Sequence, residues 1–228
     1  MAHPDGKRRV LVVEAARTYL QTMRLVLLVG FLVSLMSASY AARPVKLVVL
    51  GDSLTAGYGI EAQQAFPAKL ETALRQRGFD VVVENAGVSG DTAKQGLERL
   101  DWSVGEDADA VIVELGANDA LRGVDPNETR KSLDEIIGRL KERNIPVMIA
   151  GMLAPPNLGA AYKELFDAIY PSLADKHEVA LYPFFLDGVA TDPSLNLDDG
   201  MHPNAPGVEE IVKRMLPKVE EFLTMVKP

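Results

Sequence analysis

Ser53 is the first residue of this sequence whose position invites a chemical interpretation. It follows an apolar stretch in "VVLGDSLTAG", residues 48–57, where a buried strand would end in a turn. A serine hydroxyl is a weak nucleophile at neutral pH and needs a neighbouring base. Ser53 could equally be a helix N-cap or a turn residue, so the serine by itself leaves its role open.

A base and a carboxylate that could orient it occur together near the end of the chain. His202 lies in the polar loop "DPSLNLDDGMHPN", residues 192–204. Asp199 precedes it by three residues and can fold back to accept a hydrogen bond from the imidazole. Ser53, His202 and Asp199 therefore predict a nucleophile, a general base and the residue that orients the base. The alternatives are an exposed loop histidine and an Asp198-Asp199 pair in which Asp199 is dispensable.

Donors for a developing oxyanion follow two further apolar stretches. Gly90 lies in "NAGVSGDT", residues 85–92, and Asn118 lies in "LGAND", residues 115–119. A carbonyl under attack needs preorganised N–H donors, and an amide side chain donates without carrying charge. We expect the backbone N–H groups of Ser53 and Gly90 and the side chain of Asn118 to form an oxyanion hole. Taken singly, the glycine could be a turn residue and the Asn-Asp pair a turn former.

The elements that must bring these residues together form a repeating pattern. After residue 43, short apolar stretches alternate with helical patterns, which is typical of βαβ units. Strands are expected at 45–50, 81–83, 110–115, 146–152 and 179–185, and helices at 66–77, 92–100, 126–143, 160–174 and from about 206, with Pro217 expected to kink or split the last helix. Right-handed crossovers favour one doubly wound parallel sheet in the order 2-1-3-4-5. The carboxyl ends of its strands share one edge, where the candidate residues would meet.

Composition and charge exclude several classes of protein. The chain has 228 residues, a formal net charge of −8 and no cysteine. The acidic balance argues against nucleic acid as a partner. The lack of cysteine excludes disulfides, thiolate metal sites and cysteine nucleophiles. No linker or internal repeat interrupts the pattern, so we expect a single domain over residues 43–228 and a monomer.

The first 42 residues have the pattern of an export leader. From Met23, "MRLVLLVGFLVSLMSASYAARP" combines a basic start, an apolar run and small residues, which is typical of a secretory signal peptide. The apolar run is shorter than the roughly 20 residues needed to cross a bilayer. We expect residues 1–42 to be an N-terminal extension plus signal peptide, with no stable membrane insertion after cleavage. The protein would then be periplasmic or secreted. Alternatives are a retained anchor and a translation start at Met23 instead of Met1.

Four blocks of this sequence resemble those of the GDSL, or SGNH, hydrolases. They are Gly51-Asp52-Ser53-Leu54, Gly90, Gly116-x-Asn118-Asp119 and Asp199-x-x-His202-Pro203. Longer stretches, such as "SGDTAKQGLERL" and "VELGANDALRG", resemble a bacterial periplasmic branch of acyl-CoA thioesterases, lysophospholipases and arylesterases. The resemblance implies a three-layer α/β/α sandwich and no metal or other cofactor. It also implies hydrolysis of small-molecule carboxylic esters and acyl thioesters through an acyl-enzyme on Ser53.

The resemblance also implies where the acyl chain would bind. The segment "LAPPNLG", residues 153–159, matches the one that lines the acyl groove of the branch. The expected substrate contacts are therefore Leu153, Ala154, Pro155 and Leu158. The branch often has an aromatic side chain where this chain has Leu158, which leaves the preferred acyl length open.

Three other functions are compatible with parts of the sequence. "GYGIEA", residues 57–62, fits a GxGxxA pattern of nucleotide-dependent enzymes, although its glycines follow the first strand too late to open a helix there. Asp52, Asn118, Asp119 and His202 could be ligands in a metallophosphoesterase, but such sites need more histidines and carboxylates. A non-catalytic periplasmic module that binds lipid or glycan would use the same fold and pocket.

Overall fold

Five parallel strands form the centre of the computed structural model, which describes residues 17, 23 and 43–226. The strands are β1 (Val45–Gly51), β2 (Val81–Gly87), β3 (Ala110–Glu114), β4 (Val147–Ala150) and β5 (Ala180–Tyr182). They pair in the order β2-β1-β3-β4-β5. This is the predicted order, and it places β1 and β3 at the centre of the sheet.

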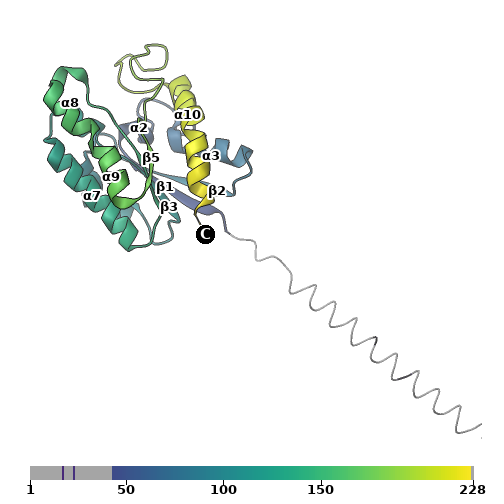
Figure 1. Cartoon of the computed structure of the whole chain (residues 1–228). Coiled ribbons are helices and arrows are strands. Elements are labelled where there is room, and N and C mark those ends of the chain that lie inside the picture. Colours follow the sequence, from purple (N-terminus) through teal and green to yellow (C-terminus); the bar gives the residue numbers. More distant parts are fainter. Residues whose placement is uncertain (1–16, 18–22, 24–42, 227–228) are drawn as a thin grey trace, which may run out of the picture. The chain divides into compact units, whose positions relative to one another are not determined.

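Helices cover both faces of the sheet. They are α2 (Ser53–Ala56), α3 (Phe66–Gln76), α4 (Ala93–Glu98), α5 (Leu100–Ser103), α6 (Ala117–Leu121), α7 (Pro126–Glu142), α8 (Ala160–Asp167), α9 (Ile169–His177) and α10 (Ala205–Thr224), with short 3-10 turns η1 (Ala62–Gln64) and η2 (Pro156–Leu158). α3 and α10 pack together on one face (Figure 1), and α7 lies on the other, in contact with α4 and α9. The result is the expected three-layer α/β/α sandwich.

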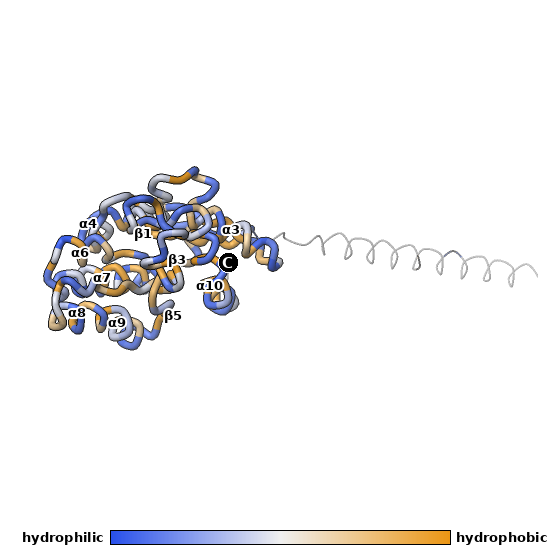
Figure 2. The backbone as a smooth tube through the Cα atoms, turned by 90° about the horizontal axis from the view of Figure 1, so that it is seen from above, coloured by the Kyte–Doolittle hydropathy of each residue, from blue (hydrophilic) through white to orange (hydrophobic). Residues whose placement is uncertain are grey.

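The core lies on both sides of the central strands. Residues 47–50 of β1 and 110–113 of β3 are completely buried, and the tube through these strands is hydrophobic (Figure 2). β2 is less completely buried than β1 and β3: Val81 and Val83 are buried, but Val82 is 40% exposed. β2 is an edge strand with one partly open face, so its side chains alternate between core and solvent.

Two predicted helices are divided in the structure. The segment 160–174 forms α8 and α9, which are separated at Ala168. Pro171 explains the break, because it has no N–H to continue the α8 hydrogen-bond ladder and its ring would crowd the carbonyl four residues earlier. The segment 92–100 divides at Arg99 into α4 and α5. By contrast, α10 continues through Pro217 and is not split there.

The leader predicted from sequence lies almost entirely outside the described residues. Only Arg17 and Met23 of the first 42 residues are described, so the expected signal peptide has no structural description. Among the helices that the structure does describe, none combines the length and apolar character needed to span a membrane.

Candidate active site

Ser53 is the first residue of α2 and directly follows β1. Asp52 is the N-cap of this helix, because its Oδ1 accepts a hydrogen bond from the Leu54 N–H at 3.0 Å. The alternative of Ser53 as the cap is therefore wrong, and the Ser53 hydroxyl is left for other contacts. The N–H groups of a first helical turn have no partner within the helix, so the Ser53 N–H is also available to a ligand.

The structure brings Ser53, His202 and Asp199 into one hydrogen-bonded chain. Ser53 Oγ lies 3.0 Å from His202 Nε2, and His202 Nδ1 lies 2.7 Å from Asp199 Oδ2. The loop that carries the last two is closed by the Leu197 N–H, which donates to the His202 carbonyl at 2.8 Å. The His202 side chain keeps only 19% of its surface exposed, so it is not the freely solvated loop histidine of the alternative interpretation.

The Asp199 carboxylate determines which nitrogen of the neutral His202 ring carries the hydrogen. It accepts hydrogen bonds from the backbone N–H groups of His202 and Met201 at 3.0 and 2.9 Å. These bonds, together with the contact to the ring, lower the pKa of Asp199 to about 2. An ionised carboxylate can only accept, so in the neutral ring Nδ1 carries the hydrogen and Nε2 accepts from Ser53.

Asn118 and Gly90 contribute possible donors from two other strand ends. Asn118, in α6, donates from Nδ2 to Asp52 Oδ2 at 3.0 Å, and its second amide N–H stays available. Gly90 has a φ of +88° in the turn after β2, a conformation that glycine adopts without strain. The Gly90 N–H makes no hydrogen bond with any residue that the structure describes. Ser53 and Asn118 both line the cavity described below, whereas Gly90 does not.

Two buried carboxyl groups lie beneath the Ser53 turn. Burial raises the pKa of Asp52 to about 6, against the opposing effect of its hydrogen bonds from Leu54 and Asn118. Glu114, at the end of β3, is completely buried, and this burial together with the nearby Asp52 raises its pKa well above the ordinary value. Glu114 Oε2 accepts a long 3.4 Å hydrogen bond from the Asp52 N–H, and nothing in the sequence pattern indicated this pair.

Asp119 has a structural role that its neighbour Asn118 does not share. Its side chain is buried, and it accepts hydrogen bonds from the Ala93 N–H at 2.8 Å and from Thr129 Oγ1 at 3.0 Å. It thereby connects α6 to the start of α4 and to α7. Within the described residues, no group of three or more His, Asp or Glu side chains is placed to hold a metal ion.

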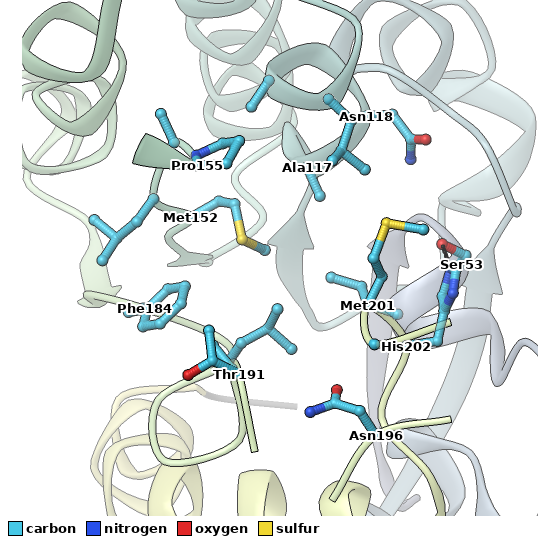
Figure 3. A pocket seen from close by; sticks show the side chains of 18 of the residues that line it. Ser53, Ala117, Asn118, Met152, Pro155, Phe184, Thr191, Asn196, Met201 and His202 are labelled. Carbon is cyan, nitrogen blue, oxygen red and sulfur yellow. Dashed lines mark hydrogen bonds between the residues drawn. The ribbon is translucent and has the colours of Figure 1, made fainter. Parts of the chain in front are cut away.

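A largely apolar cavity of about 560 Å³ opens beside Ser53 and His202. Figure 3 shows Met152, Pro155 and Phe184 across the cavity from the serine and the histidine. Its walls are built mainly from apolar side chains: Leu54, Ala117, Ala120, Leu121, Met152, Leu153, Ala154, Pro155, Pro156, Phe184, Leu186, Ala190 and Met201. Such a lining suits an aliphatic chain, with the polar groups gathered at the serine end.

Residues 49–209 match the GDSL-like Lipase/Acylhydrolase family. The chain belongs to this family. It is therefore a serine enzyme that hydrolyses carboxylic esters, as the four sequence blocks indicate.

Named relatives of this GDSL hydrolase cover most of its length. The arylesterase of Vibrio mimicus is 42% identical over 200 residues, which are 86% of this chain and 98% of the relative. The thioesterase 1/protease 1/lysophospholipase L1 of Escherichia coli K12 is 42% identical over 165 residues, 72% of this chain and 78% of the relative. The crystal structure of AlinE4, an SGNH-hydrolase family esterase, has a TM-score of 0.68 and 46% identity over 80% of this chain and 98% of its own. The crystal structure of TesA has a TM-score of 0.74 and 34% identity over 78% of this chain and 99% of its own.

Three of the four expected substrate contacts of the GDSL hydrolase line the cavity. Leu153, Ala154 and Pro155 line the cavity, but Leu158 is not among the residues that line it. Leu158 ends η2 and packs against the hydrophobic core instead. Phe184, Leu186 and Met201 line the cavity and were not predicted from the sequence.

Tyr58 is another residue of the site that motif analysis missed. Its ring lies against the His202 ring, with 4.5 Å between centroids, and half of its surface is exposed. Tyr58 lies in the "GYGIEA" segment that resembles a nucleotide-binding motif. That interpretation is wrong, because Gly57 ends α2 in a left-handed conformation and the glycines open no helix. No sequence pattern indicated the contact between Tyr58 and His202.

Proposed function

We propose that this GDSL hydrolase works through an acyl-enzyme on Ser53. The observation that carries the proposal is the contact of 3.0 Å between Ser53 Oγ and His202 Nε2, continued at 2.7 Å to Asp199. Ser53 attacks the acyl carbonyl while His202 takes the hydroxyl proton as general base. Asp199 holds the ring in orientation and stabilises the imidazolium that forms.

The negative charge that develops on the carbonyl oxygen would meet three N–H donors. These are the backbone N–H groups of Ser53 and Gly90 and the side chain of Asn118. Collapse of the tetrahedral intermediate breaks the bond to the leaving group, which receives the proton from His202. Water, activated by the same histidine, then attacks the acyl-enzyme and releases a carboxylic acid and free Ser53.

The substrates would be small-molecule esters and thioesters of aliphatic acids. The apolar cavity beside Ser53 supports an alkyl chain on the acyl side of the scissile bond. Relatives named arylesterase and thioesterase 1/protease 1/lysophospholipase L1 support a leaving group that can be an alcohol, a phenol or a thiol.

We further propose that the enzyme is exported and acts as a monomer in the periplasm or outside the cell. The basic, apolar and small-residue pattern of residues 23–42 supports cleavage of a leader before the domain at 43–228. The acidic net charge of −8 supports the exclusion of nucleic acid as a partner.

Hydrolysis of p-nitrophenyl esters with acyl chains of two to twelve carbons tests the proposal. The comparison is between wild type, Ser53→Ala and the control Ser194→Ala, each with and without EDTA. Ser194 is an exposed serine in the loop that leads to His202, and its hydroxyl donates to Asp192. We expect turnover in wild type and the control, resistance to EDTA, and no turnover in Ser53→Ala.

Any of three results would contradict the mechanism. Turnover that persists in a folded Ser53→Ala variant would show that Ser53 is not the nucleophile. Turnover abolished by EDTA would favour a metallophosphoesterase-like site. A folded wild type that binds p-nitrophenyl decanoate without cleaving it would favour the lipid-binding module.

A further inference from the structure

Arg99 is a buried cation close to the site that the proposed mechanism does not use. It lies between α4 and α5, with 6% of its surface exposed. Its Nε donates to Asp91 Oδ2 at 2.6 Å, and its Nη2 donates to the Gly51 carbonyl at 2.8 Å. Its Nη1 donates to the Ala86 carbonyl and to Ser103 Oγ at 2.8 and 2.9 Å. Each guanidinium nitrogen therefore has at least one defined acceptor.

The acceptors of Arg99 belong to the two segments that hold proposed oxyanion donors. Gly51 is two residues before Ser53 at the end of β1. Asp91 directly follows Gly90 in the turn after β2. One buried side chain thus joins the segment of the Ser53 N–H to the segment of the Gly90 N–H.

Hydrogen bonds connect both ends of the turn that contains Gly90 to the Gly51 carbonyl, directly at one end and through Arg99 at the other. At its start, the Val88 N–H donates to the Gly51 carbonyl at 3.1 Å, and the Asp91 N–H closes the turn on the Val88 carbonyl at 3.1 Å. At its end, the Asp91 carboxylate meets Arg99, which itself donates to Gly51. The hydrogen bonds form a closed ring, and Gly90 lies inside it at the third turn position, where its positive φ fits a type II turn.

We propose that Arg99 is a positioning residue that sets the distance and direction between the Ser53 and Gly90 N–H groups. This inference rests on the proposed function, because it assigns both groups to the oxyanion hole. Preorganised donors act only if they point at the developing charge, and a misplacement of about 1 Å can cost on the order of a hundredfold in rate. Loss of Arg99 should therefore weaken stabilisation of the transition state more than it weakens substrate binding.

Arginine suits this role for a geometric reason. The planar guanidinium presents five N–H donors in a rigid arrangement and can satisfy Gly51, Ala86 and Asp91 at once. A lysine ammonium could stay beside Asp91, but its compact donor group on a flexible stem could not reach the same set of acceptors. Arg99→Lys therefore keeps the buried charge pair and removes the fixed geometry.

The test compares Arg99→Lys with Arg143→Lys. Arg143 Nη2 also donates to two backbone carbonyls, those of Val104 and Gly105, at 2.7 and 2.8 Å, but these precede β3 and lie away from the oxyanion donors. Circular dichroism and thermal unfolding first identify a temperature at which wild type and every variant are fully folded. The steady-state constants kcat and KM for p-nitrophenyl butyrate are then measured at that temperature.

We expect kcat of Arg99→Lys to fall about ten- to hundredfold with KM nearly unchanged, and Arg143→Lys to keep the wild-type kcat. Asp91→Asn should lower kcat in the same direction, and the double variant should lose little more than either single variant, because the two side chains act as one unit. A folded Arg99→Lys with wild-type kcat would overturn the inference, as would fully additive losses in the double variant. If Ser53→Ala in parallel retains activity, the proposed function fails instead; if it is inactive while Arg99→Lys is unaffected, only the inference fails.

Discussion

Asn118 is the residue whose side chain connects the nucleophile turn to the rest of the site. One amide hydrogen is donated to Asp52 at 3.0 Å, which fixes the amide and leaves the other hydrogen available to an oxyanion. This arrangement explains why an amide serves here and a hydroxyl would not, since two donors on one planar group are needed. The proposed role of Asn118 is therefore inseparable from that of the acid beside it.

Asn118→Ala should lower kcat about 10²- to 10³-fold, with a much smaller effect on KM, because an oxyanion donor acts mainly in the transition state. The measurement is the kcat and KM of p-nitrophenyl butyrate hydrolysis. Asn127→Ala is the control, since Asn127 lies on exposed α7 surface and its amide contacts only Asp125. An Asn118→Ala enzyme of near wild-type kcat would contradict the oxyanion role.

Asp52 should control both activity and the pH dependence of stability. Asp52→Asn offers one acceptor oxygen in place of two, so it cannot serve both Leu54 and Asn118, and we expect kcat to fall about tenfold or more. The pKa of Asp52 is about 6 in the folded protein and 3.8 ordinarily, so the folded state binds this proton more tightly than the unfolded chain. Its contribution to the free energy of unfolding should therefore fall, by on the order of 2–3 kcal/mol, as the pH rises from about 4 to about 6.

Urea unfolding of wild type and Asp52→Asn between pH 4 and pH 7 measures this contribution as a difference. Glu114, whose pKa is raised in the same direction, stays in both proteins and largely cancels. Parallel pH profiles for the two proteins would show that the Asp52 carboxyl is not perturbed by burial.

At the scale of elements, α6, α4 and α7 are held together beneath the site by polar contacts. Thr129, completely buried in α7, donates to the Asp119 carboxylate, whose other oxygen receives the Ala93 N–H at the start of α4. Asp119 in turn is the neighbour of Asn118. The helix that carries the amide donor is thus oriented by α7, which follows it in the chain, and by α4, which precedes β3.

Thr129→Val removes the hydroxyl at nearly constant shape and leaves one oxygen of Asp119 without its donor. We expect the free energy of unfolding to fall by about 1–3 kcal/mol, measured by urea denaturation. Thr72→Val is the matched control, because the exposed Thr72 hydroxyl bonds only to a carbonyl of its own helix and its loss should cost less than about 0.5 kcal/mol. Equal losses in the two variants would contradict the connecting role of Thr129.

Pro217 lies on an exposed position inside α10, where it supplies no N–H to the helix. Pro217→Ala should raise the free energy of unfolding by about 1–2 kcal/mol, because the restored hydrogen bond outweighs the added freedom of the unfolded chain. Pro206→Ala in the first turn of the same helix should give no gain, since that N–H has no partner within the helix. Thermal unfolding compares the two, and a gain at Pro206 alone would contradict this account.

At the scale of the whole molecule, the site is assembled from segments that follow four different strands. Ser53 follows β1, Asn118 follows β3, Met152 follows β4, and Phe184 and His202 follow β5. The parallel sheet brings all of these ends to one edge. The cavity is therefore a property of the complete sandwich, and changes in its wall should alter substrate choice without altering the chemistry.

Phe184→Ala should enlarge the far side of the cavity and move the acyl-length optimum toward longer chains. Each additional buried methylene contributes up to about 0.8 kcal/mol, or about fourfold in kcat/KM, until the cavity is full. The measurement is kcat/KM for p-nitrophenyl esters from two to twelve carbons, with the acetyl ester, which has the shortest acyl chain, as the internal reference. An unchanged optimum would show that the acyl chain does not lie against Phe184.

The sequence by itself determined the sheet order, the family and the residue types of the site. Strands and helices are encoded by local periodicity, and the right-handed crossover rule then leaves few topologies. Ser53, Gly90, Asn118, Asp199 and His202 could be selected because each stands at the end of a predicted strand or in the last loop. Their proposed roles stay predictions that the kinetic tests above address.

Only the tertiary structure decided the contacts between segments that are distant in the chain. The exposure of Val82 on β2, the packing of Leu158 against the core and the ring of Tyr58 against His202 each depend on how packed elements meet. The same holds for the buried Arg99, which in sequence is one arginine in a polar helix and in space joins two strand ends. Such contacts depend on the packing of the complete fold and have no local pattern, so no stretch of sequence could have indicated them.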